Sequence, residues 1–324
     1  MPNKKIVSII GTGVIGAGWA ARFIASGYHV QAFDPSSKSL KKLKIDVKKA
    51  LTSLSRIGLH KNASIKNLSF HNNLKDSLQN TSFVQENAPE NEKLKTLLLK
   101  EIDQLLDKKI IIASSSSGLL PTKIQSKCKF PNRVLIGHPF NPVYLLPLVE
   151  IVKGKKTSQQ SALKLKKIYE SIGMKPLIVR KEIEGYISDR LQEALWRESL
   201  HLIKDGVAST EEIDDAIVYG PGLRWAFMGV CLTFHLAGGE EGMKHMLKQF
   251  GPTLKLPWTK LKAPKLDKKL KDRMISGTKK QAGKLSIDDL EKQRDLFLIE
   301  IMKTLNNNHK SNFPNWGKKF NSFK

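Results

Sequence analysis

The stretch from Ile6 to Gly16 constrains the fold of this chain more than any other part. Ile6 to Ile10 is a short β-branched run that stops at a glycine, as buried parallel strands do. Three glycines with GxGxxG spacing follow it: Gly11, Gly13 and Gly16. The stretch from Val14 to Ser26 is helical in character, and a second strand is expected at His29 to Phe33. The pattern predicts a βαβ unit with a glycine-rich first turn.

This turn has the properties of a dinucleotide site. Gly11 permits the tight turn, Gly13 lets the backbone approach a pyrophosphate, and Gly16 allows close packing of helix and sheet. The free N–H groups at the helix start, at Val14 and Ile15, favour an anion. A purely structural turn is the alternative reading of the glycines.

Asp34 decides which dinucleotide is expected. It follows the second strand, 18 residues after Gly16, where a carboxylate accepts hydrogen bonds from ribose hydroxyls. The 2′-phosphate of NADP would be repelled by the negative charge of this carboxylate. We therefore expect NAD rather than NADP, with capping of a helix as the alternative role for Asp34.

Strands and helices continue to alternate through the first half of the chain. Further strands are expected at 82–85, 110–113, 134–137, 148–152 and 177–179, and helices at 92–106 and 158–171. This alternation predicts an α/β fold, a Rossmann-type doubly wound parallel sheet over residues 1–184.

After about Glu184 the strand pattern ends. Helices are expected at 186–204, at 239–250, 265–276 and 287–305, and after Ser209, which forms a capping-box pattern with Glu212. We expect an all-helical second domain over residues 185–305 and a Lys/Asn-rich tail over residues 306–324.

The net charge of +25 raises the question of an anionic partner. Only nine of the 55 basic residues are Arg, whereas base readout and bidentate phosphate contacts favour Arg. The lysines are also spread over helix-like segments such as 38–49. A solvated lysine-rich surface is therefore the expected reading, with no nucleic-acid partner.

Cysteines and hydropathy indicate a cytoplasmic protein. Cys128 and Cys231 match neither a metal-ligand spacing nor a disulfide framework, so we expect two reduced thiols and no metal. No apolar stretch approaches the roughly 20 residues that span a bilayer, and the N-terminus lacks the features of a signal peptide. We expect no membrane partner.

His138 is the candidate for acid-base chemistry. It follows a predicted strand, in the segment Gly137-His-Pro-Phe-Asn-Pro, and so belongs at the carboxyl edge of the sheet. Imidazole titrates near neutral pH, which suits it to take the proton of an alcohol as a hydride leaves. Glu150 could orient it as a carboxylate does in hydrolase triads. On these residues alone, a packed His and a surface Glu remain possible.

GHPFNP with a Glu twelve residues after the His, together with GTGVIG and a Ser-rich strand end, resembles the L-3-hydroxyacyl-CoA dehydrogenase superfamily. The resemblance runs from Ile6 to about Leu305. It implies that His138 is the general base, that Glu150 orients it, and that Ser117 bonds the reacting oxygen. Ser115 and Ser116 replace the usual Asn and Thr, which leaves the choice among these hydroxyls open.

The resemblance also bears on cofactor and assembly. Glu90, just before the predicted helix at 92–106, and Lys95, within it, complete the candidate cofactor residues. Members of this superfamily usually form a two-fold dimer through the helical domain. We therefore expect a homodimer.

Asp189 departs from the common pattern, which has Asn before Arg190 in the long helix. An Asn donates to an alkoxide, whereas an ionised Asp only accepts and repels negative charge. Asp189 is therefore expected either to favour a cationic substrate or to pair with Arg190 or Arg197.

Other residues of the second domain suit a cation. Trp196 shares a helix face with Asp189, and the segment 219–229 adds Arg224 and Trp225. Tyr219 and Phe227 could extend an aromatic cage, and Arg224 could bind a carboxylate. Core packing remains the alternative for the aromatic residues.

Three segments, DRLQEALWRES, STEEIDDAI and GPGLRWAFMG, resemble the family of L-carnitine dehydrogenases within this superfamily. This resemblance implies oxidation of L-carnitine to 3-dehydrocarnitine with NAD, with Arg224 toward the carboxylate and the acidic and aromatic groups toward the trimethylammonium. An acyl-CoA or an L-gulonate-type 3-hydroxy acid is the alternative substrate. A non-catalytic NAD-binding protein is the alternative of a different class.

Overall fold

The computed structural model describes residues 5–36, 38–226, 229–260, 262, 265 and 267–307. The chain divides into two compact units. Among the described residues, the first unit holds those up to Ile187 together with Leu298–Lys303, and the second holds Ser188–Phe297 and those from Thr304 on. The expected tail lies outside the described residues from position 308 on.

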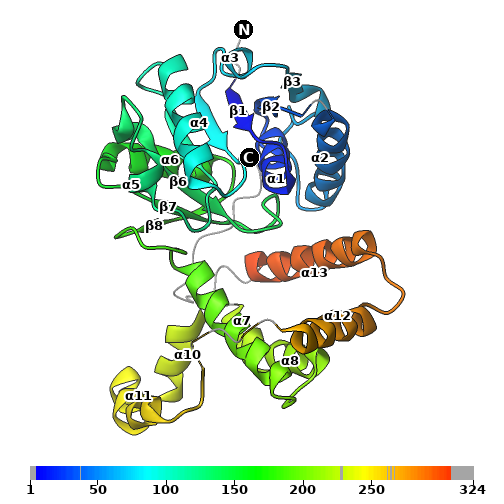
Figure 1. The fold of residues 1–324 in the computed structure, drawn as a ribbon. Helices are drawn as coiled ribbons and strands as arrows, with labels where there is room; N and C mark the ends of the chain where they lie inside the picture. Colours follow the sequence, from blue (N-terminus) through cyan, green and yellow to red (C-terminus); the bar gives the residue numbers. More distant parts are fainter. Residues whose placement is uncertain are drawn as a thin grey trace. The chain divides into compact units, whose positions relative to one another are not determined.

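An eight-stranded sheet forms the centre of the first unit (Figure 1). Its strands are β1 (Ile6–Ile10), β2 (His29–Phe33), β3 (Leu68–His71), β4 (Phe83–Glu86), β5 (Ile111–Ser114), β6 (Val134–Pro139), β7 (Leu148–Val152) and β8 (Lys175–Val179). The order is β3-β2-β1-β4-β5-β6-β7-β8, and every neighbouring pair is parallel except β6 and β7. The predicted Rossmann-type sheet is confirmed. β3 was not predicted, and neither was the antiparallel pair.

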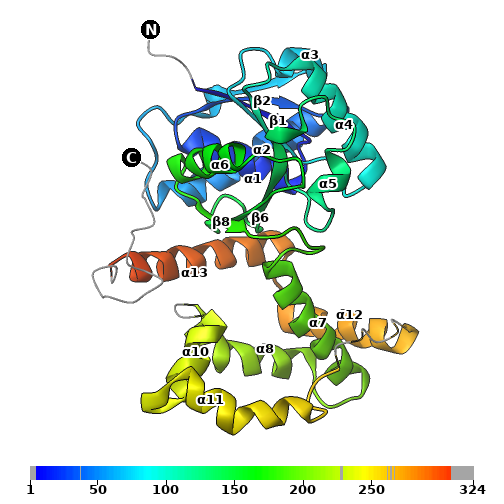
Figure 2. The same ribbon diagram turned by 90° about the vertical axis from the view of Figure 1, so that its left-hand side faces the viewer.

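Helices cover both faces of this sheet, which makes it doubly wound. Figure 2 shows α1 (Val14–Ala25), α2 (Ser39–Ser55) and α6 (Gln159–Ser171) on one side, and α3 (Leu74–Ser77), α4 (Glu92–Leu105) and α5 (Pro121–Ile124) on the other. One buried cluster joins Trp19, Leu43 and Tyr169 to the sheet, and a second joins Leu99 and Ile124. The strands therefore lie between two apolar layers, as their continuous hydrophobic runs predict.

Local sequence signals set the ends of the helices in this unit. The Asn91 side chain accepts a hydrogen bond from Leu94 N at the start of α4, and Ser158 accepts from Ser161 N at the start of α6. Two short 3₁₀ helices, Ile65–Asn67 and Pro131–Arg133, precede β3 and β6. The Asn91 and Ser158 caps fix the starts of α4 and α6, the helices that follow β4 and β7.

The second unit is helical. Its elements are α7 (Ser188–Lys204), α8 (Thr210–Val218), α9 (Pro221–Trp225), α10 (Gly229–Ala237), α11 (Met243–Phe250) and α12 (Lys268–Ala282), with 3₁₀ helices at Gly239–Glu241 and Gly251–Lys255. α13 (Ile287–Asn307) has residues in both units. The predicted capping box is present, since Ser209 and Glu212 bond each other's backbone at the start of α8.

The helices after residue 185 differ from the sequence prediction in several details, among them α10, which was not predicted, and α12, which was expected at 265–276. The long helix begins at Ser188 and not at Tyr186, whose φ of +46° is left-handed. The segment 219–229, for which no helix was predicted, contains α9, which Pro221 begins. Within the described part of the chain, no helix has the length and apolar character that crossing a membrane requires.

Candidate active site

The glycine-rich turn leaves room for a ligand at the start of α1. Gly11 has φ +86°, and a Cβ there would collide with the backbone of Asn87. A Cβ on Gly16 would overlap the Gly11 carbonyl, whereas the space beside Gly13 is open. Gly13 is the N-cap of α1 and gives it no side-chain hydrogen bond, so the first N–H groups of the helix, beginning at Val14, face that space without a side-chain cap. These residues fit a pyrophosphate.

Asp34, at the end of β2, is held as a carboxylate. Oδ2 accepts hydrogen bonds from Thr12 N and Thr12 Oγ1, and Oδ1 accepts from Ser36 N and Ser39 Oγ. Burial would raise the pKa of this carboxyl, but the four hydrogen bonds outweigh burial and lower it. The side chain therefore presents a negative charge beside the glycine-rich turn. An ionised carboxylate at this position is what binding of the ribose hydroxyls of NAD requires.

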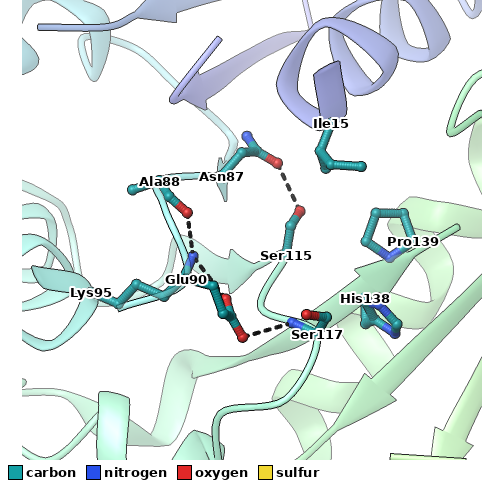
Figure 3. Close-up of a pocket in the computed structure, with 9 residues that line it drawn as sticks. All are labelled: Ile15, Asn87, Ala88, Glu90, Lys95, Ser115, Ser117, His138 and Pro139. Atoms are coloured by element: carbon teal, nitrogen blue, oxygen red, sulfur yellow. Dashed lines mark hydrogen bonds and ion pairs between the residues drawn. The ribbon is translucent and has the colours of Figure 1, made fainter. Parts of the chain in front are cut away.

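A cavity of about 290 Å³ opens at the carboxyl ends of β1, β4, β5 and β6 (Figure 3). The residues that line it are Ile15, Asn87, Ala88, Glu90, Lys95, Ser115, Ser117, His138 and Pro139. The cavity thus brings together the helix start, two expected cofactor residues, the expected serine and the expected base. It lies where open α/β sheets bind their ligands.

The serine-rich segment after β5 has most of its hydroxyls engaged. Ser114 donates to Glu86, Ser115 donates to Asn87 Oδ1 at 2.7 Å, and Ser116 donates to Glu90 Oε1 at 2.5 Å. The Ser117 hydroxyl lines the cavity and has no hydrogen-bond partner among the described residues. Of these serines, Ser117 is therefore the one whose hydroxyl is available to a ligand.

Glu90 shapes the loop that carries Ser117. Its Oε1 accepts a hydrogen bond from the backbone N–H of Ser117 at 3.1 Å (Figure 3) and another from that of Gly118 at 3.0 Å. A single carboxylate oxygen thus fixes the turn after β5, in addition to lining the cavity. The sequence placed Glu90 beside the cofactor and missed this contact with the loop.

Lys95 is held inside the protein by Glu86. Its Nζ lies 2.9 Å from Glu86 Oε1 and 3.1 Å from Oε2, and it donates to the Ala88 carbonyl at 2.8 Å. Both side chains are buried, and Glu90 Oε2 lies 3.8 Å from the same Nζ. Lys95 therefore supports the cavity wall while its charge is neutralised by Glu86.

Asn87 is a cavity residue that sequence reasoning missed. Its Nδ2 donates to the Gln85 carbonyl at 3.0 Å, and its Oδ1 accepts from Ser115, whose hydroxyl also accepts from Trp19 Nε1. This partly buried network ties the ends of β4 and β5 to α1. The polar run Gln85-Glu86-Asn87 at a strand end was the signal in the sequence.

His138 and Glu150 form a buried pair. The two residues are direct partners in the antiparallel β6–β7 ladder, and His138 Nδ1 lies 3.0 Å from Glu150 Oε2. His138 is 5% exposed and Glu150 is fully buried. The Phe140 ring packs against the imidazole with centroids 4.7 Å apart. This geometry fixes the ring and assigns the proton on Nδ1 to the bond with the carboxylate.

The four substrate candidates belong to the second unit. Asp189 is in the first turn of α7 and accepts from Gln192 Nε2 at 3.5 Å, and Trp196 is half exposed farther along the same helix. Arg224, which is exposed, and Trp225 are on α9. Arg197 lies 3.4 Å from Glu193, and Phe227 lies outside the described residues.

Comparison with known proteins decides the family. The NAD binding domain of 3-hydroxyacyl-CoA dehydrogenase matches residues 6–183, and the C-terminal domain of the same enzymes matches residues 185–285. The chain belongs to the 3-hydroxyacyl-CoA dehydrogenase family. It is accordingly an NAD-dependent 3-hydroxy-acid dehydrogenase with NAD as its cofactor.

Its curated relatives include L-carnitine dehydrogenases. The protein from Bacillus cereus is 51% identical over 301 residues, which covers 93% of this chain and 92% of the relative. The protein from Pseudomonas putida is 50% identical over 301 residues, which covers 93% of this chain and 94% of the relative. The chain therefore groups with this branch of the family.

Solved structures share the whole architecture. FHMPC 5-dehydrogenase, described as an NAD+ dependent dismutase, matches with a TM-score of 0.76 and 25% identity, covering 93% of this chain and 98% of that one. FadB2 of M. tuberculosis matches with a TM-score of 0.65 and 24% identity, covering 88% and 96%. The second likeness shows the fold alone.

Proposed function

We propose that this enzyme oxidises the 3-hydroxyl of L-carnitine to 3-dehydrocarnitine, with His138 as the general base oriented by Glu150. The observation that carries the chemistry is the buried His138–Glu150 pair, whose histidine lines the same cavity as Ser117. The observation that favours the substrate is the identity of about half to curated L-carnitine dehydrogenases.

NAD+, when bound, accepts the hydride from the substrate carbon. Gly13 and the start of α1 would hold its pyrophosphate, and Asp34 would bind its ribose. The structure fits this assignment because the space at Gly13 is open and the Asp34 carboxylate is ionised.

His138 supplies the base. With Nδ1–H bonded to Glu150, the basic nitrogen is Nε2, which takes the hydroxyl proton of the substrate. The Glu150 carboxylate then stabilises the imidazolium that forms. Because both side chains are buried, water screens this interaction little.

Ser117 donates a hydrogen bond to the reacting oxygen in this proposal. Its hydroxyl has no protein partner among the described residues, so it need not break a bond to reach the substrate. Glu90 holds the backbone on both sides of the Ser117–Gly118 bond and so limits the movement of this loop. A preorganised donor of this kind stabilises developing negative charge.

The second unit supplies the groups that would distinguish a zwitterionic substrate. Arg224 is proposed to bind the substrate carboxylate, and Asp189, Trp196 and Trp225 to surround the trimethylammonium group. The exposed guanidinium of Arg224 is accessible to a carboxylate. A quaternary ammonium cannot donate a strong hydrogen bond, so aromatic faces and an anion are its natural partners.

A panel of substrates tests this assignment. Purified protein is supplied with NAD and L-carnitine, 3-hydroxybutyryl-CoA or L-gulonate, and NADH is followed by absorbance. We expect turnover with L-carnitine and little with the other two. Turnover with the CoA ester or the sugar acid, and none with L-carnitine, would contradict L-carnitine as the substrate and favour the compound that is oxidised.

Two variants test the residues. His138→Ala is expected to abolish turnover while the affinity for NAD stays close to that of the wild type, and an active variant would remove His138 from the mechanism. Asp189→Asn is expected to reduce kcat/KM more with L-carnitine than with an uncharged hydroxy acid. Equal reductions would contradict the role of Asp189 toward a cation.

We further propose that the enzyme acts in the cytoplasm as a homodimer that associates through its helical unit. Large apolar side chains are exposed there on several helices, including Leu223, Leu236, Leu247 and Phe297. Such an apolar surface fits burial against a second copy. Light scattering after size-exclusion chromatography distinguishes the expected dimer of about twice 36.4 kDa from a monomer.

A further inference from the structure

Tyr186 and Ile187, which directly precede α7, contact both members of the His138–Glu150 pair. The Tyr186 ring lies against the imidazole of His138, with centroids 5.4 Å apart and planes at 62°. The backbone N–H of Ile187 donates to Glu150 Oε1 at 3.1 Å, while Oε2 of the same carboxylate contacts His138. Two consecutive residues thus hold the base and its carboxylate from the same side.

Tyr186 also holds the loop that carries Ser117. Its hydroxyl donates to the Leu119 carbonyl at 2.8 Å, and the Leu119 N–H contacts Ser116 Oγ at 3.2 Å. The Tyr186 side chain is fully buried, so its ring and its hydroxyl are both committed to these contacts. One side chain therefore connects the imidazole with the serine loop.

The backbone at this point is in a conformation that needs support. Gly185 has φ +70° and Tyr186 has φ +46°, a left-handed geometry that is rare for a bulky aromatic residue. Such a geometry persists only where the surroundings hold it, and it is found often at functional sites. Here the phenol bond, the bond from Ile187 N, and the contact of Thr122 N with Glu182 Oε2 at 3.1 Å provide that support.

We propose that Tyr186 is a positioning residue of the dehydrogenase reaction. Its ring sets the orientation of the His138 imidazole, and its hydroxyl sets the Ser117 loop at a fixed separation from that ring. The proposal rests on the proposed role of His138 as the general base. The Tyr186 ring aligns the His138 imidazole, and the Tyr186 hydroxyl aligns the Ser117 side chain through its loop.

Two substitutions separate these contributions. Tyr186→Phe keeps the ring and removes the bond to Leu119, whereas Tyr186→Leu removes both. The matched control is Tyr28→Phe, which removes a phenol hydroxyl 2.9 Å from Ser171 Oγ, away from the cavity-lining residues. Each protein is assayed for kcat, KM for NAD and melting temperature, with the substrate that the wild type oxidises.

We expect Tyr186→Phe to lower kcat about threefold to tenfold, the loss that one hydrogen bond accounts for. Tyr186→Leu is expected to lower kcat by about 100-fold. The Tyr186→Phe variant should therefore keep most of the activity that the Tyr186→Leu variant loses, because it retains the ring. KM for NAD is expected to stay within about twofold, because the ring and hydroxyl of Tyr186 contact His138 and Leu119, which are not cofactor candidates. Tyr28→Phe is expected to change melting temperature without changing kcat.

The proposal is overturned if both Tyr186 variants keep the wild-type kcat, or if their loss of kcat is matched by Tyr28→Phe. Should Tyr186→Leu not fold, the kcat of Tyr186→Phe against Tyr28→Phe decides. His138→Ala is measured alongside. An active His138→Ala refutes the proposed function, whereas an inactive His138→Ala with wild-type Tyr186 variants refutes only the role of Tyr186.

Discussion

His138 Nδ1 and Glu150 Oε2 lie 3.0 Å apart across the antiparallel β6–β7 ladder, with the two residues in direct register. Side chains at paired positions of a ladder point to the same face of the sheet. The contact is therefore built into the strand pairing and does not depend on a flexible loop.

Replacing Glu150 with Gln is expected to lower kcat by about 10³-fold, because a neutral amide does not stabilise an imidazolium and can favour the wrong tautomer. KM for NAD should change little. Steady-state kinetics of Glu150→Gln beside Glu170→Gln, whose carboxylate pairs with Lys166 on the surface of α6, provide the comparison. Equal activity of the two variants would contradict a role for Glu150.

Replacing Asp34 with Asn should raise KM for NAD about tenfold or more with kcat nearly unchanged, because the variant loses charge-assisted hydrogen bonds. Asp46→Asn, which removes a partly buried carboxylate paired with Lys42, is the matched control. An unchanged KM for NAD in Asp34→Asn would remove Asp34 from the cofactor site.

Asp34 also predicts a dependence of stability on pH. Because its pKa is lowered in the folded protein, its stabilising contribution is present above the unfolded pKa of about 4 and is lost as pH falls through the folded value. Urea unfolding from pH 7 to pH 3 should therefore show a smaller loss of stability for Asp34→Asn than for the wild type. An equal loss of unfolding free energy between pH 7 and pH 3 in the two proteins would contradict this prediction.

The buried Glu86–Lys95 pair predicts a large effect on stability. Lys95→Met leaves the Glu86 carboxylate without its cation, at a cost of about 3–5 kcal/mol of unfolding free energy. The double variant Glu86→Gln, Lys95→Met should recover part of that loss. Urea denaturation followed by circular dichroism measures both, with the exposed Lys93→Met as control. A Lys95→Met protein as stable as the control would show that Glu86 does not need this cation.

Cys128 is expected to resist alkylation in the folded protein. Burial, with a further contribution from Asp103, raises the pKa of its thiol to about 12. At pH 8 only about one thiol in ten thousand is then the reactive thiolate. Peptide mass spectrometry after iodoacetamide treatment should show Cys128 modified only when urea is present. Rapid modification of Cys128 without urea would contradict this burial.

Much of the fold follows from the sequence because the strongest patterns lie at buried elements. β1, β2 and β7 have the bounds that the sequence predicts, because their apolar side chains mark the buried positions of each strand. β3 was missed because it is four residues long and pairs only with β2 at the sheet edge, where burial imposes little pattern. The direction of β7 was also missed, since a hydrophobic run does not encode strand polarity.

The sequence suggests some residues of the candidate site and few of their contacts. His138 and Glu150 are candidates from their residue types, and the family resemblance gives them paired roles, because nothing local indicates that residues twelve apart are paired across a ladder. The choice of Ser117 among neighbouring serines depends on which hydroxyls Glu86, Asn87 and Glu90 engage. Tyr186 carried no signal beyond an aromatic after Gly185, and it was assigned to the helix.

The pairing of β6 with β7 makes the His–Glu contact tolerant of some changes and intolerant of others. Additional residues in the connection between Asn141 and Pro147 would lengthen the loop and leave position 138 opposite position 150. One residue inserted within either strand would turn one partner to the opposite face of the sheet, because side chains alternate along a strand. Gain or loss of a single codon inside β6 or β7 should therefore inactivate the enzyme far more readily than variation in the segment that joins them.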